Sequence, residues 1–237
     1  MPQFMIMILE SDAEERRLAP AATKALVEAH AAYVQQLLAA AAFLDGERLR
    51  PPAEGRRVTA RDGHPRVEAG PFEDRALGGY YVVEATDLDA ALTFATACPA
   101  PPGAELEVRP LMKGSLQPDK TSRPGRVFAF AVLGNAPSEP GWIAIMDQID
   151  ASSRDGFPAE RRRGGVRLQP PGSGRRLAAP STGGRRAVFD GPFLESKEVI
   201  GGLFCMRMAN LDEAVDWASR SEFVKHGVVE IRELWRS

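Results

Sequence analysis

The spacing of apolar residues predicts that the chain begins with a strand and continues into a long helix. Residues 4–9 are apolar throughout, at a length typical of a strand that is buried on both faces. From residue 21 to residue 44 the apolar positions recur every three or four residues, which predicts one face of a helix. The members of this face are Leu26, His30, Tyr33, Leu37, Ala40 and Leu44. His30 therefore occupies a position otherwise given to apolar or aromatic groups.

The remaining elements of the first half are predicted from residue type and turn signals. Aromatic and β-branched residues favour strands, alternating polarity favours a strand with one solvated face, and Asp before an apolar run favours a helix start. We therefore expect, in order, a hairpin of residues 58–60 and 65–68 across the turn Asp62-Gly63, a strand at 79–84, a helix from residue 88 to 95 capped by Asp87, and a strand at 105–109.

The second half of the chain repeats the first. Glu107 and Arg109 return as Glu230 and Arg232, at a separation of 123 residues (230 − 107). Further repeated pairs are the Gly-Gly motif at 78–79 and 201–202, Leu-Asp at 88–89 and 211–212, and Leu-x-Pro-Pro at 49–52 and 168–171. The chain therefore consists of two copies of one domain.

A linker is predicted between the copies. Residues 113–126 contain Gly, Pro, Ser and charged residues without apolar periodicity. We place the first domain at 1–113, the linker at 114–126 and the second domain at 127–237. In the second domain we expect a strand at 127–133, a helix at 142–152, a strand at 203–208, a helix at 211–219 capped by Asn210, and a strand at 228–234. This order indicates an α+β protein of two tandem ferredoxin-like units, each an antiparallel sheet with both helices on one face.

Charge and composition narrow the range of partners. A net charge of −2 provides no long-range field for nucleic acid, and no apolar run reaches about 18 residues, so we expect neither a nucleic-acid nor a membrane partner. Cys98 and Cys205 occupy non-equivalent positions without metal-ligand spacing, which favours reduced, buried thiols in a cytoplasmic protein.

One arginine-rich segment leaves two interpretations open. Residues 154–186 carry nine arginines among many Gly and Pro residues. A solvated loop is the plainer interpretation. Binding of an anionic ligand or a nucleic acid is the alternative, although only Phe157 is present for base stacking.

The motifs together resemble the YCII-related family, and within it the DGPF-type branch. They are Asp-Gly-Pro-Phe at 190–193, Ala-Gly-Pro-Phe at 69–72, Asp-Gly-Glu at 45–47, Leu-x-Pro-Pro, Leu-Asp-x-Ala and the closing Glu-x-Arg. The resemblance implies a dimeric α/β barrel, in which two ferredoxin-like sheets face each other around a cleft. In this chain the tandem units would form an intrachain pseudo-dimer, as a monomer or a homodimer. Most relatives have no assigned activity, and some resemble lyase-type or dehalogenating enzymes that use a His paired with an Asp.

His30 is the first candidate for catalysis, because it aligns with the helix histidine of the family. An imidazole can act as general acid or base when a carboxylate orients it. The carboxylates expected to do so are Glu10 or Asp12, after the first strand, and Asp190 of the second copy. For His30 the alternative is a core histidine, and for Asp190 it is a turn lock. The second domain has no equivalent imidazole, since that position falls near residues 149–150.

Three further residues are candidates for substrate binding. Arg109 and Arg232 are matched across the repeat, which suggests one role for both: a bond to a substrate carboxylate or an ion pair with Glu107 and Glu230. Tyr33 shares the helix face of His30. The other histidines, His64 and His226, are expected at the surface. We expect no metal and no cofactor, since the sequence contains no zinc-type spacing, Walker loop, GxGxxG or Ser-His-Asp arrangement.

Two functions follow from these observations. The first is a cofactor-independent enzyme of lyase or isomerase type, acting on a small organic molecule with His30 as acid or base. The second is a non-catalytic module that binds a small molecule or regulates another process. An enzyme predicts a pocket that reaches His30 with a carboxylate within hydrogen-bond range, whereas a module predicts a packed imidazole bonded to the backbone.

Overall fold

The computed structural model describes residues 1–10, 18–72, 76–115, 125–134, 144, 161–178, 186–190 and 199–235. The elements of the first half are β1 (Gln3–Glu10), α2 (Pro20–Ala39), β2 (Phe43–Arg48), η1 (Pro52–Glu54), β3 (Arg56–Arg61), β4 (His64–Ala69), β5 (Ala76–Glu84), α3 (Leu88–Ala97) and β6 (Glu105–Ser115). Those of the second half are β7 (Arg126–Gly134), β8 (Arg162–Leu168), η2 (Pro171–Ser173), β9 (Arg175–Leu177), β10 (Val188–Asp190), β11 (Val199–Met208), α5 (Leu211–Arg220), α6 (Phe223–His226) and β12 (Val228–Glu233).

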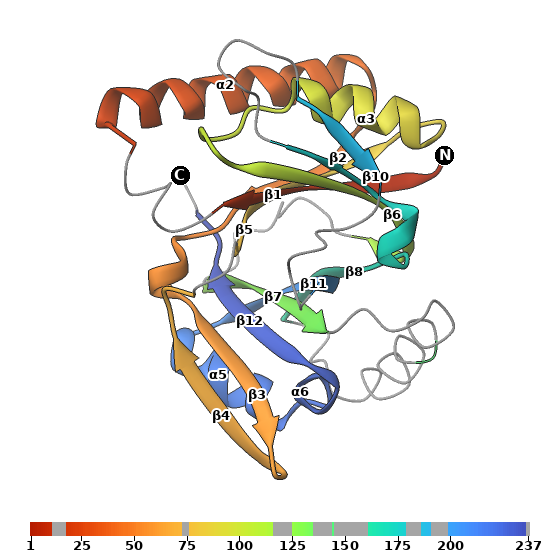
Figure 1. The fold of residues 1–237 in the computed structure, drawn as a ribbon. Helices are drawn as coiled ribbons and strands as arrows, with labels where there is room; N and C mark the ends of the chain where they lie inside the picture. The colour runs from red at the N-terminus through yellow and green to blue at the C-terminus, as the bar shows by residue number, and fades with distance from the viewer. Residues whose placement is uncertain are drawn as a thin grey trace.

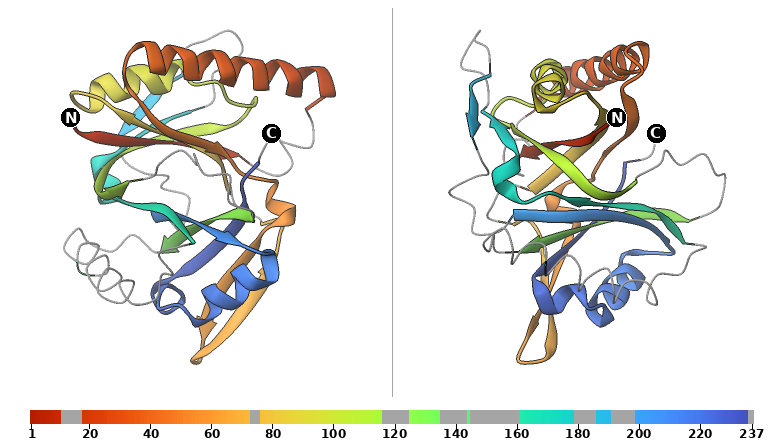
Figure 2. Two further views of the ribbon diagram at one scale, coloured as in Figure 1. Left: turned by 180° about the vertical axis from the view of Figure 1, so that it is seen from behind. Right: turned by 90° about the vertical axis from the view of Figure 1, so that its right-hand side faces the viewer.

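The two halves share one strand order. It runs β2-β5-β1-β6 in the first half and β8-β11-β7-β12 in the second, and every pairing is antiparallel. Each half therefore has the ferredoxin-like order, with its first and third major strands in the centre. The two sheets face each other, with α2 and α3 outside the first and α5 and α6 outside the second (Figures 1 and 2). The expected α+β class is confirmed.

Each half contributes a segment that extends the sheet of the other half. The β3–β4 hairpin of the first half pairs with β12 (Figure 1). In return, β9 of the second half pairs with β6. The closing strand β6 also pairs directly with β8. At the opposite side, Leu49 and Leu234 form a single antiparallel bridge. The halves are thus joined through backbone hydrogen bonds on both sides.

Strand β1 is apolar on both faces because it lies between two cores. Phe4, Ile6 and Ile8 belong to the core beneath α2 and α3. Met5 and Met7 belong to the core between the two sheets. The expectation of a doubly buried central strand is confirmed.

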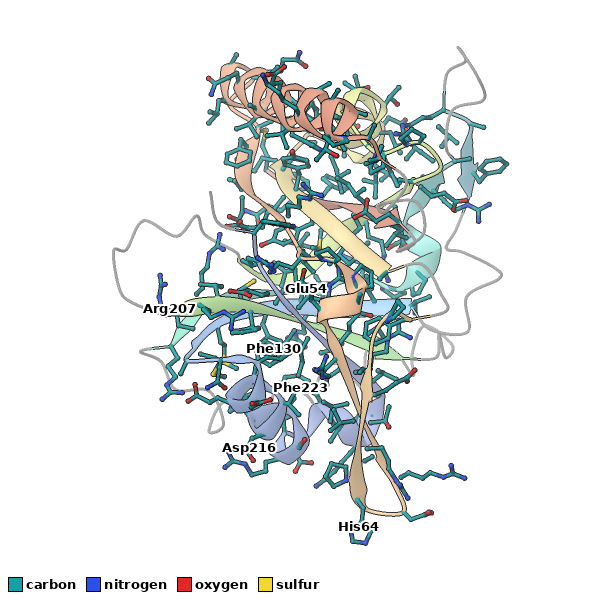
Figure 3. All side chains as sticks on the ribbon, turned by 90° about the vertical axis from the view of Figure 1, so that its left-hand side faces the viewer. Glu54, His64, Phe130, Arg207, Asp216 and Phe223 are labelled. Carbon is teal, nitrogen blue, oxygen red and sulfur yellow. The ribbon has the colours of Figure 1, made fainter. Side chains whose placement is uncertain are left out.

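An aromatic cluster fills the corresponding core of the second half. The rings of Phe130 and Phe204 stack with their centroids 4.9 Å apart, and those of Phe204 and Phe223 stack at 5.0 Å. Figure 3 shows Phe130 and Phe223 between the sheet and its helices, and His64 at the tip of the β3–β4 hairpin. His64 is exposed, as expected, whereas His226, also expected at the surface, is half-buried at the end of α6.

The first helix ends earlier than its apolar spacing predicts. It stops at Ala39, and Ala41 has φ of 52°. The amide of Ala42 then donates to the carbonyl of Leu37 at 2.9 Å, and that of Ala41 to Leu38, which is the bonding of a Schellman cap. The predicted extension to residue 44 is wrong, because residues 43–48 pair with β5 as β2.

The other expected elements are largely confirmed, and both helix caps are present. The amide of Ala90 donates to Asp87 at 2.8 Å, and that of Glu213 to Asn210 at 2.9 Å. β6 continues to Ser115, beyond the expected start of the linker. The predicted helix at 142–152 lies outside the described residues, apart from Ala144.

The arginine-rich segment is only partly a loop. Its described part contains β8 and β9, and Val166, Leu168 and Leu177 are buried. The expectation of a continuous solvated loop is therefore wrong for 161–178, because apolar residues between the arginines pair with neighbouring strands. Across the described part of the chain, the helices are too short or too polar to span a membrane.

Candidate active site

A pocket of about 260 Å³ lies between α2 and the outer edge of the first sheet. Its apolar wall includes Ile8, Leu26, Val27, Val34 and Pro101, and its polar residues are Glu10, His30, Glu47, Arg48, Tyr80 and Tyr81. The volume suits a small organic molecule. The structure thus brings His30 and Glu10, two of the residues selected from the sequence, into the lining of one pocket.

The imidazole of His30 is held by a phenol. Its Nδ1 lies 2.8 Å from the hydroxyl oxygen of Tyr81, and the two rings are stacked with centroids 6.1 Å apart. Tyr81 belongs to β5, where it follows the Gly-Gly motif. The hydrogen-bond partner of His30 is therefore neither the carboxylate expected of an enzyme nor the backbone group expected of a core histidine.

His30 is neutral at physiological pH. Burial, followed by the positive charge of Arg48, lowers the pKa of its imidazole from 6.5 to about 4. Burial also raises the pKa of the Tyr81 hydroxyl well above its ordinary value, so this group stays protonated. The pair can exchange hydrogen bonds with a ligand without carrying a charge of its own.

The lowered pKa of His30 predicts that the fold loses stability in acid. Because the folded protein binds this proton more weakly than the unfolded chain, protonation favours unfolding. The loss starts as pH falls below 6.5 and is complete below about 4. It should reach up to about 3 kcal/mol.

Urea unfolding of the wild type and of His30→Gln at pH 7, 5.5 and 4 measures this contribution. We expect the variant to have a flatter dependence on pH over this interval, since it lacks the titrating group. Equal slopes for the two proteins would contradict the lowered pKa of His30.

Glu10 reaches the pocket because Gly78 leaves space for it. The side chain of Glu10 comes from the end of β1 and is 5% exposed. A Cβ at Gly78 would lie 2.6 Å from Glu10 Cγ and would overlap the carboxylate. The first glycine of the Gly-Gly motif is therefore required here because any larger residue would displace the Glu10 side chain.

A buried ionic network holds Glu47, the second carboxylate of the pocket. Arg163 of β8 contacts Asp45 at 2.9 Å and Glu47 at 2.6 Å, and the hydroxyl of Tyr80 donates to Asp45 at 2.9 Å. Burial raises the pKa of Asp45 even with Arg163 beside it. Cys205 lies 3.9 Å from the Tyr80 hydroxyl.

Both cysteines match the expectation of buried, unpaired thiols. Burial raises the pKa of Cys98 and of Cys205 to about 12. Neither thiol is therefore an activated nucleophile.

Arg109 and Arg232 occupy equivalent positions at the boundary between the halves. Arg109 Nε lies 2.8 Å from Glu107, and Arg232 Nη1 lies 3.1 Å from Glu230. Each arginine also donates to the Leu-x-Pro-Pro segment of the other half: Arg109 to the Gln169 carbonyl at 3.4 Å, and Arg232 to the Arg50 carbonyl at 2.6 Å. Both are buried away from the pocket of His30. This geometry agrees with the ion-pair alternative, and a role in substrate binding stays a prediction.

Glycines after the Leu-x-Pro-Pro segments make room for these arginines. A Cβ at Gly55 would lie 2.6 Å from Arg232 Cδ, and one at Gly174 would lie 2.6 Å from Arg109 Cγ. The repeated motifs of the two halves are thus in contact with each other.

Tyr33 and Asp190 are the remaining candidates from the sequence, and Tyr33 does not line the pocket. Tyr33 is buried behind the pocket, where its hydroxyl donates to the Phe94 carbonyl at 2.9 Å and its ring packs edge-on against Tyr81. Asp190, in β10, pairs through its backbone with Arg175 of β9. The side chain of Asp190 and the whole of Asp12 lie outside the described part of the chain.

The sequence did not single out Tyr81 or Arg48. Tyr81 stood within the predicted strand after the Gly-Gly motif, and Arg48 follows Asp-Gly-Glu. An aromatic on the helix-facing side of that strand was the signal available for Tyr81. Among the residues that the structure describes, His, Cys, Asp and Glu form no group of three that could hold a metal ion.

Comparison with known proteins identifies the domain. The YCII-related domain matches residues 3–114 and 148–237. A search of curated proteins found no match. Similar solved structures include a candidate chlorite dismutase (10% identity, covering 100% of this chain and 96% of that chain, TM-score 0.39). Another is a candidate monooxygenase from Fusobacterium nucleatum subsp. nucleatum (11% identity, covering 98% and 90%, TM-score 0.42).

Proposed function

The chain belongs to the YCII-related domain family, and we propose that its first half is a cofactor-independent enzyme that moves a proton on a small, largely apolar organic molecule. The observation that carries this proposal is the position of His30. It is a neutral imidazole in the wall of a 260 Å³ pocket, hydrogen-bonded to Tyr81 and close to the charge of Arg48.

The chemistry follows from the two ring nitrogens. In the tautomer that donates from Nδ1 to the Tyr81 oxygen, Nε2 is unprotonated and can accept a proton from a carbon next to a carbonyl group. The Tyr81 hydroxyl and the Arg48 guanidinium then stabilise the negative charge that develops on the carbonyl oxygen. Return of the proton to a second carbon gives isomerisation, and loss of a leaving group from the neighbouring carbon gives elimination.

A binding module is the second candidate, and one observation favours it. The partner of Nδ1 is a phenol, whereas histidine bases are commonly oriented by a carboxylate. In a binding module the same pocket would hold a small molecule without turnover.

We also propose that the two sheets form a barrel-type pseudo-dimer within one chain. The β6–β8 pairing on one side and the Leu49–Leu234 bridge on the other support this arrangement. The bridge is reinforced by the amide of Trp235, which donates to the Arg48 carbonyl at 2.8 Å, and by that of Arg50, which donates to Glu233. We further propose that the chain belongs to the DGPF branch of the family, on the strength of its Asp-Gly-Pro-Phe motif at 190–193.

A thermal-shift screen tests whether the pocket binds ligands. Wild type and His30→Gln are compared against small lactones, phenols, carboxylates and carbonyl compounds. A compound at about 100 times its Kd should stabilise the wild type by roughly 2.7 kcal/mol. We expect hits that are lost in His30→Gln. Hits that persist unchanged in the variant would place the ligand site elsewhere.

A further inference from the structure

The two charged side chains that β2 contributes to the pocket are both held by residues of the second half. Glu47 and Arg48 line the pocket beside His30. Glu47 contacts Arg163 of β8, and Arg48 contacts Trp235, which follows β12. Neither Arg163 nor Trp235 is part of the pocket lining.

Arg163 fixes the direction of Glu47. One guanidinium nitrogen lies 2.6 Å from Glu47 Oε1 and the other lies 2.9 Å from Asp45 Oδ1. The side chain of Arg163 is 4% exposed, so these contacts are shielded from solvent. A planar fork that spans two carboxylates restricts each of them more than a point charge would.

Trp235 restricts Arg48 in a similar way. The guanidinium carbon of Arg48 lies 5.5 Å from the centroid of the Trp235 indole ring. The guanidinium carbon of Arg50 lies 4.5 Å from the same centroid. The backbone amide of Trp235 donates to the Arg48 carbonyl at 2.8 Å. The C-terminal end of the second half is therefore in contact with both the backbone and the side chain of Arg48.

We infer that Arg163 and Trp235 are positioning residues, through which the second half of the chain sets the charges around His30. The second half has no histidine of its own at the equivalent position, near residues 149–150. Its contribution to the site is to hold Glu47 away from the imidazole and Arg48 close to it. The inference deepens the proposed function, but its test reads the imidazole directly and needs no substrate.

The test is an NMR titration of the His30 imidazole in variants of the two residues. The titratable and charged residues lining the pocket around His30 are Tyr80 and Tyr81 on β5, Glu10 on β1, and Glu47 and Arg48 on β2. Trp235→Leu should release Arg48 and raise the pKa of His30 by roughly half a unit. Arg163→Met should release Glu47, whose negative charge also raises this pKa. Trp235→Phe and Arg163→Lys, which keep a ring face or a positive charge, should recover part of the shift.

Arg57→Gln is the matched control. Arg57 also joins the two halves, through Glu230 at 3.0 Å, but it is not part of the pocket. We expect this variant to leave the His30 titration unchanged, and His64 and His226 serve as internal references in every spectrum.

Two outcomes decide the inference. An upward shift of the His30 pKa in Trp235→Leu, absent from Arg57→Gln, supports it. Unchanged titration in Trp235→Leu and in Arg163→Met, with only a lower melting temperature, overturns it. Because Trp235 is 39% exposed, its variants decide the question even if Arg163→Met fails to fold. If the shift occurs but no compound ever binds at His30, the proposed function fails while the positioning role stands.

Discussion

Replacement of Arg109 by Met should lower the free energy of unfolding by about 3–5 kcal/mol. Arg109 is fully buried, lies 2.8 Å from Glu107 and donates to the carbonyls of Ile200 and Gln169. The substitution leaves the Glu107 carboxylate buried without this cation. It also removes hydrogen bonds that join the first half to the second.

The matched variant is Arg232→Met, at the equivalent position. We expect it to be less destabilising, because Glu230 keeps a second cation, Arg57, at 3.0 Å. Urea unfolding measures both. The double variant Arg109→Met with Glu107→Gln should recover part of the loss, since it removes the stranded charge.

This comparison also separates the two roles proposed for Arg109. If Arg109 binds a substrate carboxylate, its loss should weaken ligand binding while stability changes little. A cost below about 1 kcal/mol in Arg109→Met would contradict the structural role, because a buried charge would then have been left without consequence.

The second large effect is expected at His30. If the imidazole transfers a proton, His30→Gln should lower the rate of proton exchange by about 10²- to 10⁴-fold. Glutamine keeps hydrogen-bonding capacity beside Tyr81 but cannot accept a proton at this site. The fold should remain intact, since His30 is half-buried on one face of α2.

Deuterium incorporation measures this rate. Compounds that bind in the thermal-shift screen and carry a hydrogen next to a carbonyl group are incubated with the protein in D₂O, and the loss of that proton signal is followed by NMR. Tyr81→Phe removes the hydroxyl while keeping the ring, and should also slow the exchange. Equal exchange in wild type and His30→Gln would leave the binding module as the better description.

Local patterns predicted most of the elements, because each depends on residues close in sequence. The doubly apolar run became β1, and the caps at Asp87 and Asn210 begin helices as expected. The repeat predicted that both halves share one topology. These features require only spacing, residue type and turn chemistry.

Strand β2 could not be predicted in the same way. Its sequence, FLDGER, has no run of β-branched residues, and it is a strand because it pairs with β5. The exchange of β3 and β9 between the halves was missed for the same reason. A local sequence pattern can indicate that a segment forms a strand, but it does not identify the strand with which it pairs. Strands β3 and β12, which pair, are separated by more than a hundred residues.

The site was predicted in part. His30 was identified from an imidazole on an apolar face, and Glu10 from its place after the first strand; both line the pocket. Tyr81 and Arg48 were missed, because no local signal distinguishes a pocket tyrosine or arginine from one at the surface. The sequence predicted one role for the matched arginines, Arg109 and Arg232. It could not show that each donates to the Leu-x-Pro-Pro segment of the other half.

The most direct test of the pocket is an NMR titration of the wild-type protein with a compound found in the thermal-shift screen. The three histidines give separate imidazole signals, assigned by substitution. We expect the signals of His30 to shift in proportion to the bound fraction, while those of His64 and His226 stay in place. A compound that stabilises the protein but leaves the His30 signals unmoved would contradict the assignment of this pocket as the functional site.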